Sequence, residues 1–200
     1  MAVLVPVYWA NYGPTNFLYF CDLALFLVLA GIWTESALLV SLPAVGILLP
    51  QMLWCVDFLV ELWGGRLTGL TAYMGDPNRS LFLRGLSLFH GWLPFLVFYL
   101  VKKLGYDRRA LPGWIAIATL VCLVAFFFLP PAGAVRADPK TPRNINYVFG
   151  LSDTKPQSVL PPLTYLGAWM AALTGIILLP THFLLRKLCP MPAASRPSTR

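Results

Sequence analysis

The chain has 200 residues, of which 58% are apolar and only 12% are charged, and its mean hydropathy is +0.70. This composition excludes an intrinsically disordered chain and argues against a water-soluble domain. The formal net charge is +7, but the Lys and Arg residues stand in short loops between apolar segments. Basic residues placed in this way orient membrane spans, so we expect no binding to nucleic acid.

The first 65 residues contain no Lys or Arg, and their apolar segments have the length of membrane spans. Residues 1–15 carry aromatic rings that suit the membrane–water interface, and a first span is predicted at 16–33. A second span is predicted at 37–63. Pro43 and Pro50 each remove a backbone hydrogen bond from it. We therefore expect one long bent helix, with a break at Pro50 into two half-spans as the alternative.

The third predicted span, at residues 81–101, carries a histidine near its middle. No charged residue follows Arg84 in this segment, so its length and composition are those of a transmembrane helix. His90 precedes Pro94 by four residues, and because proline has no N–H, the His90 carbonyl loses its helical partner. Ionisable groups at such depth usually face a bundle interior or a wet cavity. We therefore expect the functional site here.

Two further spans, at 111–129 and 161–185, complete the predicted fold, and a polar, proline-rich loop at 130–160 joins them. The sequence predicts an all-α, polytopic integral membrane helix bundle with five transmembrane helices, or six if the second one is broken. Residues 1–186 are expected to form a single transmembrane domain. Residues 187–200, rich in Pro, Ser and Arg, are expected to form a mobile cytoplasmic tail.

The loop at 102–110 holds four basic residues in nine positions, and such dense short loops mark the cytoplasmic side of a membrane. Two spans separate this loop from the tail, so both share that side. The N-terminus and the loops at 64–80 and 130–160 then face outward. We expect a multi-pass membrane protein whose partner is membrane lipid. A second copy of the chain and a larger membrane complex stay open as further partners.

Titratable side chains inside the spans gather, by this topology, in the outer half of the membrane. Cys21 and Asp22 lie near the start of the first span, and Asp57 and Glu61 stand four residues apart near the outer end of the second. Residues with that spacing share one face of a helix. With His90 in the third span, these groups form a candidate site by their convergence.

These residue types favour acyl transfer or hydrolysis through a cysteine. A cysteine attacks as the thiolate, and a neighbouring histidine is the usual means of generating it. We therefore expect Cys21 to be the nucleophile and His90 its general base, with Asp57 or Asp22 orienting the imidazole. A lipid ester that enters from the bilayer is the expected substrate.

Substrate binding is assigned to polar groups around this pair. Residues 144–153 are predicted to form an ordered lid that folds over the site. Acyl transfer needs donors for the developing oxyanion, and Asn146, Tyr147 and the backbone N–H groups of this loop are the candidates. Glu61 is expected to contribute to the same binding region.

The same residues leave other interpretations open. Most free cysteines are small buried apolar residues, a histidine beside a proline kink can serve packing, and Asp57 and Glu61 can be solvated at the membrane surface. A small transporter or channel subunit would use Asp57, Glu61 and His90 as a polar path. A non-catalytic accessory subunit of a membrane complex would need none of them. His182, near the end of the last span, is interpreted as interfacial.

The four cysteines are isolated in the sequence and form no CxxC, CxxCH or Cys/His cluster. A structural zinc site, a c-type haem and a disulfide framework therefore lack support. We predict neither a metal nor a cofactor.

Four short segments, taken in chain order, resemble a known family. They are NFLYFCDLALFL, ESALLVSLPAVGILLPQ, SLFHGWLPFLVFYLVKKLGY and NINYVFGLSDTKP. Their order is similar to that in the YwaF-like family of bacterial multispan membrane proteins, over roughly residues 16–185. Eukaryotic relatives of this family include a transmembrane cysteine acyltransferase that remodels ether phospholipids. The resemblance implies a multispan protein of a bacterial inner membrane that modifies lipids.

The resemblance also implies roles for individual residues. Cys21 takes the place of the nucleophile, His90 in its His-Gly pair takes the place of the base, and Asn146 with Tyr147 matches an Asn-Tyr pair. The chain departs from the family pattern at Tyr19, where the family has a histidine, and it has one N-terminal span fewer. Asp57 has no clear counterpart in the family.

Overall fold

The computed structural model describes residues 1–135, 138 and 140–192, and all regular structure within them is helical. The α-helices are α1 (Leu4–Tyr12), α2 (Phe20–Trp33), α3 (Ala37–Leu62), α4 (Leu81–Ser87), α5 (Phe89–Leu104), α6 (Ala110–Phe128), α7 (Pro162–Ala172) and α8 (Leu179–Leu188). Three short 3₁₀ helices are η1 (Pro14–Leu18), η2 (Ala72–Met74) and η3 (Ile145–Tyr147), and the π-helix η4 (Leu173–Leu178) joins α7 to α8. The all-α prediction is confirmed.

Four helical segments are long and apolar enough to cross a membrane: Ala37–Leu62, Leu81–Leu104, Ala110–Phe128 and Pro162–Leu188. The fifth predicted span is present as the shorter apolar helix Phe20–Trp33. Its 14 residues extend only ~21 Å at the usual rise, against a hydrocarbon core of ~30 Å. The helix is shorter than the predicted segment because Gly13, at φ 75°, ends α1, and the separate turn η1 follows it.

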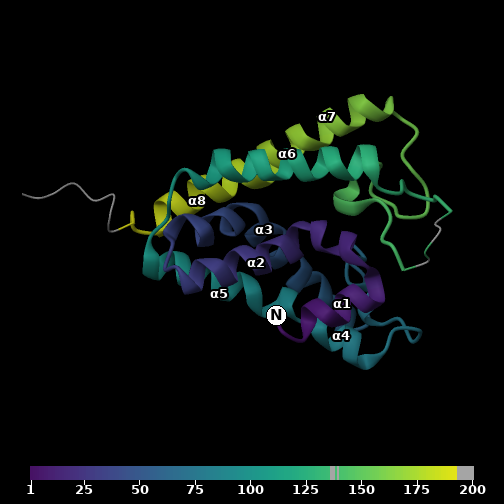
Figure 1. Cartoon of the computed structure of the whole chain (residues 1–200), viewed down its shortest axis with the longest axis horizontal. Coiled ribbons are helices and arrows are strands. Elements are labelled where there is room, and N and C mark those ends of the chain that lie inside the picture. Colours follow the sequence, from purple (N-terminus) through teal and green to yellow (C-terminus); the bar gives the residue numbers. More distant parts are fainter. Residues whose placement is uncertain (136–137, 139, 193–200) are drawn as a thin grey trace, which may run out of the picture.

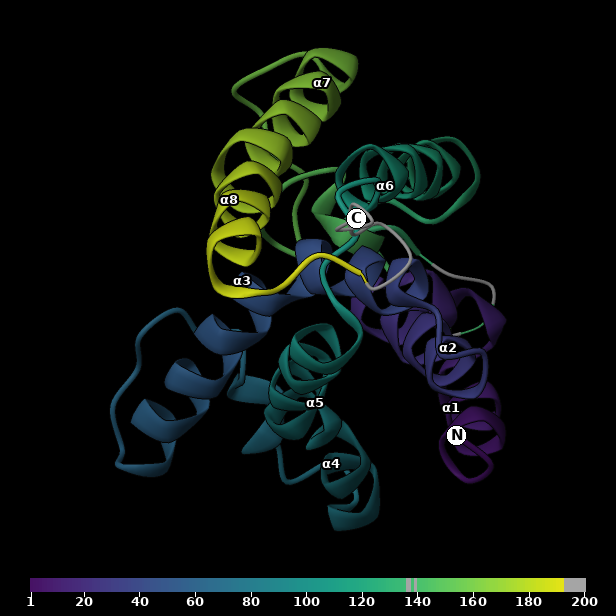
Figure 2. The ribbon, with the colours of Figure 1, turned by 90° about the vertical axis from the view of Figure 1, so that its left-hand side faces the viewer.

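Helix α3 runs through the centre of the molecule, with α4–α5 on one side, α6–α8 on the other and α2 along its flank (Figure 2). It stays one continuous helix through Pro43 and Pro50, so the preferred single helix is observed and the break at Pro50 is not. Its residues from Val40 to Leu48 are almost all buried. Close packing on every side holds the helix together where the prolines remove its own hydrogen bonds.

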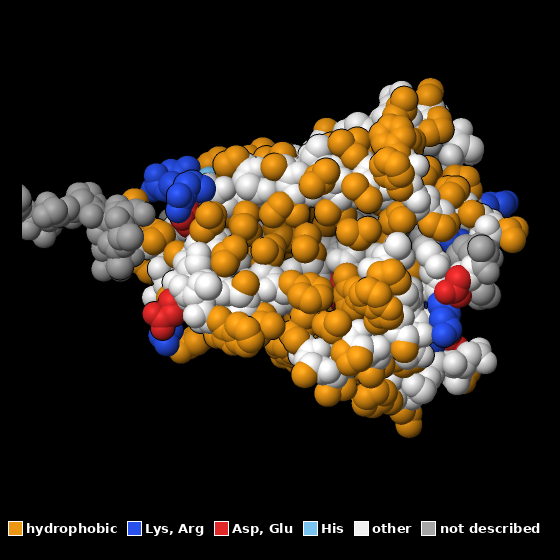
Figure 3. Space-filling view, viewed as in Figure 1, with side chains coloured by type: hydrophobic (Ala, Val, Ile, Leu, Met, Phe, Trp, Pro, Cys, Tyr) orange, Lys and Arg blue, Asp and Glu red, His pale blue; other side chains and the backbone are white. Residues whose placement is uncertain are grey.

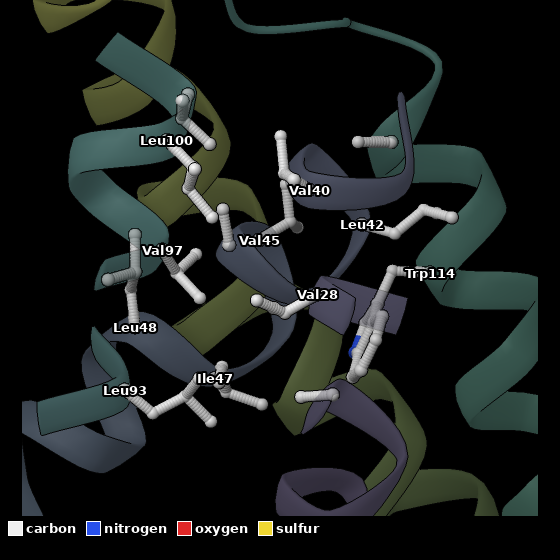
Figure 4. Packing of buried hydrophobic residues seen from close by; sticks show 14 of the residues in the cluster. Val28, Val40, Leu42, Val45, Ile47, Leu48, Leu93, Val97, Leu100 and Trp114 are labelled. Atoms are coloured by element: carbon white, nitrogen blue, oxygen red, sulfur yellow. The ribbon is translucent and has the colours of Figure 1, made fainter. Parts of the chain in front are cut away.

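The core lies where α3 meets its neighbours. Val45 and Leu48 of α3 face Val97 and Leu100 of α5 (Figure 4). On the other side, Gly46 leaves the space that the buried indole ring of Trp114, from α6, occupies. A glycine at this position allows two spans to approach closely, as small residues commonly do between membrane helices.

The third predicted span is divided, and the division lies before the histidine rather than at the proline. Helix α4 ends at Ser87, α5 begins at Phe89, and Pro94 lies inside α5. Leu88 between them makes no cap through a side chain, and its carbonyl accepts from Gly91 N at 2.9 Å in a turn. The ring of His90 is therefore carried by the first turn of a new helix.

The two ends of the bundle differ in the segments that they contain (Figure 1). At the loop end, which comprises residues 1–19, 63–80 and the described residues of 130–161, Lys140 Nζ donates to Ala10 O at 2.9 Å and Arg79 lies over the ring of Tyr12. At the tail end, which comprises 34–36, 105–109 and 189–192, Tyr106 N donates to Pro190 O at 2.7 Å. The sequence predicts the same grouping of segments, and which end faces the cytoplasm stays a prediction.

Side chains are distributed along the bundle as a bilayer requires. Apolar side chains cover the middle of the face seen in Figure 3, and Lys, Arg, Asp and Glu gather at its two ends. Large apolar side chains such as Phe127, Phe128 and Ile176 are exposed on the spans. In a membrane protein such side chains face lipid.

The tail end is fixed by buried polar contacts. Asp107 N donates to Ser41 Oγ at 3.0 Å, and the Asp107 carboxylate accepts from Arg109 N and from its guanidinium, with Oδ2 to Nη2 at 2.7 Å. His182 is buried and forms a hydrogen bond of 2.6 Å with the Tyr106 hydroxyl, so it lies inside the bundle rather than at the interface. Of the predicted tail 187–200, residues 187 and 188 belong to α8 and Pro190 is held by Tyr106, whereas 193–200 lie outside the described residues.

The Asp107 contact predicts a pH-dependent stability. The Arg109 guanidinium, by hydrogen bonding, lowers the pKa of the Asp107 carboxyl. This contact therefore stabilises the fold above the ordinary carboxyl pKa of about 3.9, and the stabilisation is lost as pH falls through the lowered pKa. We expect Asp107→Asn to lower the melting temperature near pH 7 and to match the unaltered chain once the pH falls below the lowered pKa of the carboxyl. Thermal unfolding in detergent over this range checks the result, and Arg109→Gln should reproduce it.

Candidate functional site

Cys21 is the second residue of α2, and the loop that contains Asn146 holds the start of this helix. Asn146 Oδ1 accepts from Phe20 N at 3.2 Å, and Asn146 Nδ2 donates to Leu18 O at 2.8 Å. One side chain thus caps α2 and fixes the chain just before it. Residues 144–153 therefore lie over the start of α2, as the sequence predicts.

Asn146 and Tyr147 adopt a left-handed backbone, with φ of 56° and 61°. Such a conformation costs on the order of 1–3 kcal/mol for a residue other than glycine. Two aromatic side chains of α7 hold it in place: Trp169 Nε1 donates to Asn146 O at 2.9 Å and the Tyr165 hydroxyl donates to Tyr147 O at 3.3 Å. The strained pair is clamped between α7 and α2.

These contacts change the expected roles of the Asn-Tyr pair. The Asn146 side chain uses its Oδ1 and one of its two N–H groups to hold Phe20 and Leu18, so only one N–H group is left for an oxyanion. Burial raises the pKa of the Tyr147 phenol, so this hydroxyl keeps its proton at neutral pH. Tyr147 is therefore the better donor of the two.

The imidazole of His90 has a defined tautomer. Its Nδ1 lies 2.8 Å from Ser87 O, and because a carbonyl only accepts, Nδ1 carries the proton. In the neutral ring Nε2 is then the acceptor, which is the form that a general base needs. The ring stacks against Phe89 and Trp54, with centroid distances of 4.0 and 5.2 Å.

The backbone carbonyl of His90, which Pro94 leaves without a helical partner, has a partner from another helix. The Cys55 thiol of α3 points at His90 O at 3.7 Å and at Gly91 O at 3.9 Å. A thiol is a weak donor that packs well in an apolar setting. Cys55 therefore has a structural partner and is a useful control for Cys21.

A hydrogen-bonded network that the sequence does not reveal surrounds His90. Trp54 Nε1 donates to the Tyr73 hydroxyl at 3.2 Å, and the Tyr8 and Ser87 hydroxyls are 3.1 Å apart. Tyr73 also interacts with Ser87, and burial raises the pKa of Tyr73 to about 12. The network links α1, α3, the 64–80 loop and α4. Tyr and Trp near span ends are usually read as interfacial anchors, so only the tertiary contacts identify them here.

Cys21 lies at the loop end, directly after Phe20, whose N–H donates to Asn146 Oδ1. No hydrogen bond joins the Cys21 thiol to His90, although both residues are described. On the side of His90, the Tyr73 hydroxyl accepts from Trp54, whose ring stacks on the imidazole.

Two buried polar side chains near α2 and α3 are incompletely bonded. Asn16 Nδ2 donates to Asp22 Oδ2 at 2.8 Å, whereas Asp22 Oδ1 has no partner within the described part of the chain. Both polar atoms of the Gln51 side chain, in α3, are likewise buried and unpaired. Most buried polar atoms are hydrogen-bonded, so these are places for water or a ligand to bind.

Asp57 and Glu61 hold a loop rather than the imidazole. Asp57 Oδ1 accepts from Thr68 N at 2.6 Å and from Gly69 N at 3.2 Å, and Oδ2 accepts from the backbone N and hydroxyl of Thr71, each at 2.9 Å. Glu61 Oε2 lies 2.6 Å from the same hydroxyl. A cavity of about 170 Å³ lies between the two acids and Arg66.

The structure thus brings the expected residues to one end of the bundle but in separate groups. Cys21, Asn146 and Tyr147 surround the start of α2, and His90 lies in the aromatic network. Neither Asp57 nor Asp22 is hydrogen-bonded to the imidazole, which Ser87 orients instead. Within the described residues no three His, Cys, Asp or Glu side chains are arranged as metal ligands.

The fold and the distribution of side chains define a helical membrane protein with a polar, aromatic-lined region at the loop end of its bundle. Comparisons with protein-family models, with curated proteins and with solved structures find no match to this chain.

Proposed function

We propose that this protein is a lipid acyltransferase or hydrolase of a bacterial inner membrane, in which Cys21 accepts the acyl group of a lipid ester and His90 is the general base. The observation that carries the proposal is the fixed tautomer of His90, whose Nδ1–H is held by Ser87 O while Nε2 is left as an acceptor inside a membrane-spanning segment. Imidazoles at such depth are costly and usually functional.

The position of Cys21 supports its role as nucleophile. It lies in the first turn of α2. The N–H groups of a first helical turn have no intrahelical partner and favour negative charge nearby. An apolar environment opposes a thiolate. The anion is therefore expected only when a base removes the proton as the substrate binds.

The chemistry has two balanced steps. His90 Nε2 takes the thiol proton, the sulfur attacks the ester carbonyl carbon, and the bond from that carbon to the alkoxy oxygen breaks as the leaving alcohol takes the proton back. An acceptor alcohol or water then loses a proton to His90 and attacks the thioester, and Cys21 leaves as the thiol. The Tyr147 hydroxyl is the proposed donor to the oxyanion. Because the thiol and the imidazole are not in contact, the substrate has to draw them together, as happens when apo sites tighten.

Acyl transfer to the purified protein tests this proposal. We expect incubation with acyl-labelled phospholipid to give an adduct that hydroxylamine releases, and Cys21→Ala to abolish it. His90→Gln should slow its formation by about 10²–10⁴-fold, whereas Cys55→Ala, which removes a thiol with a structural partner, should leave it unchanged. An adduct that persists in Cys21→Ala would exclude the proposed nucleophile.

A non-catalytic accessory subunit is the alternative with specific support. Asp57 and Asn146 are hydrogen-bonded within the chain and hold loops in place. If the unaltered protein forms no adduct with any phospholipid, this alternative is favoured. No comparable observation supports a transporter, for which His182 would have to continue the polar path but is bonded to Tyr106.

A further inference from the structure

A cavity of about 440 Å³ lies between α6 and the α7–η4 segment, within the ~300–1,000 Å³ typical of ligand pockets. We call it the α6–α7 cavity. It is lined on one side by Ala118 and Cys122 and on the other by Met170, Ala171 and Gly175, with further apolar side chains around them. Both sides belong to segments that are long and apolar enough to cross a membrane. The cavity therefore opens within the hydrocarbon layer.

The local sequence explains why a cavity forms here. Ala118, Ala171 and Gly175 are small, and a Cβ added to Gly175 would meet no atom within 4 Å. The π-helix Leu173–Leu178 widens the last span at the same level, and such bulges often mark functional sites. Thr174 Oγ1, one of the few polar atoms of the lining, donates to Met170 O at 2.9 Å. The lining therefore presents mainly hydrocarbon to an occupant.

One wall of the cavity packs against the residues that precede the proposed nucleophile. Cys122 belongs to a buried apolar cluster against which Tyr19, Phe20 and Met170 pack. Tyr19 and Phe20 immediately precede Cys21 in the chain, and the Phe20 ring lies 6.0 Å from that of Trp114 on α6. One apolar cluster thus connects the first turn of α2 with two residues of the cavity wall.

We propose that the α6–α7 cavity holds one acyl chain of a membrane phospholipid, the same lipid whose ester is presented to Cys21. This inference rests on the proposed function. The apolar lining, the position within the bilayer and the packing of one wall against Tyr19 and Phe20 select an acyl chain over a polar ligand. A chain that leaves the bilayer for this cavity gains packing contacts rather than freedom from water, because lipid is already apolar. Selectivity therefore depends on fit, and filling the cavity should exclude the chain.

The test uses the full-length protein in vesicles of phosphatidylcholine. A fraction of this phosphatidylcholine carries a photoreactive diazirine in its acyl chain. We expect mass spectrometry of the crosslinked protein to show labelling of Cys122 and Met170 above that of Phe183, which is exposed on the last span. Gly175→Leu, which fills the cavity, should lower the labelling of Cys122 by about tenfold or more. Gly167→Leu is the matched control, because a Cβ there also meets no atom within 4 Å and Gly167 does not line the cavity.

The outcomes separate this inference from the proposed function. Labelling of Cys122 that is no stronger than that of Phe183, or that Gly175→Leu leaves unchanged, overturns the acyl-chain site even if Cys21 forms an adduct. Cavity labelling that Gly175→Leu removes, in a protein without a Cys21 adduct, supports the lipid site and refutes the catalytic role. If the unaltered protein shows both the cavity labelling and the Cys21 adduct, Gly175→Leu should also slow adduct formation, by a factor similar to its effect on Cys122 labelling. Gly167→Leu should not slow it.

Discussion

Replacing Asp57 with asparagine is expected to destabilise the protein by about 2–4 kcal/mol, because hydrogen bonds to a charged group are worth about 1.5–3 kcal/mol each. The carboxylate of Asp57 is buried and accepts four hydrogen bonds from the 64–80 loop. An asparagine has the same shape but replaces one accepting oxygen with a donating NH₂ group. That group would face backbone N–H groups that have no other partner, so buried donors are left unpaired.

The measurement combines thermal unfolding in detergent with limited proteolysis of the loop. We expect the melting temperature of Asp57→Asn to fall by roughly 5–15 °C, given about 2–4 °C per kcal/mol for a chain of this size. Cleavage after Arg66 should become faster. Glu61→Gln is the matched control, since it lies one turn along the same face and meets the loop through the Thr71 hydroxyl alone. Equal effects of the two changes would show that Asp57 is not the main anchor of the loop.

The second large effect is expected at the crossing of α3 and α6. A Cβ added to Gly46 would lie 1.9 Å from Cε2 and 2.1 Å from Nε1 of Trp114. The indole is 1% exposed, so it has no free space into which to turn. We expect Gly46→Ala to cost about 3 kcal/mol, at the upper end for overpacking of a core.

Gly85→Ala provides the control for this change. Gly85 lies inside α4 and an added Cβ meets no atom within 4 Å, so only helix propensity acts there, and it favours alanine by up to about 1 kcal/mol. The two variants should therefore shift the melting temperature in opposite directions. Gly46→Ala combined with Trp114→Phe, which reduces the ring, should recover part of the loss. A melting temperature of Gly46→Ala equal to that of the unaltered chain would refute the close approach.

The fold class follows from the sequence because a bilayer imposes strict demands on length and polarity. The apolar segments at 37–63, 111–129 and 161–185 become helices within a few residues of the predicted bounds. Their details depend on neighbours. Two prolines do not break α3 because its flanks are packed, and α2 starts later than predicted because Gly13 and Asn146 define a turn before it.

In the candidate site, too, some features follow from the sequence and others depend on packing. The spacing of Asp57 and Glu61 correctly places both on one face of α3, but the sequence does not show that this face receives the 64–80 loop. The sequence also shows that Pro94 frees the His90 carbonyl. It does not show that the thiol of Cys55, from another helix, contacts this carbonyl. The partners of an exposed face are set by contacts between distant segments, which periodicity does not encode.

The sequence by itself determined that this chain is an all-α membrane protein, and it predicted that Cys21, Asp22, Asp57, Glu61 and His90 lie toward one end of the spans. It did so because apolar length and the positions of charges are local properties. Only the tertiary structure decided which groups touch: Asn146 with the start of α2, Tyr8 with Ser87, and Trp54 with Tyr73. Those contacts join residues far apart in the chain, and packing of the whole bundle is what selects them.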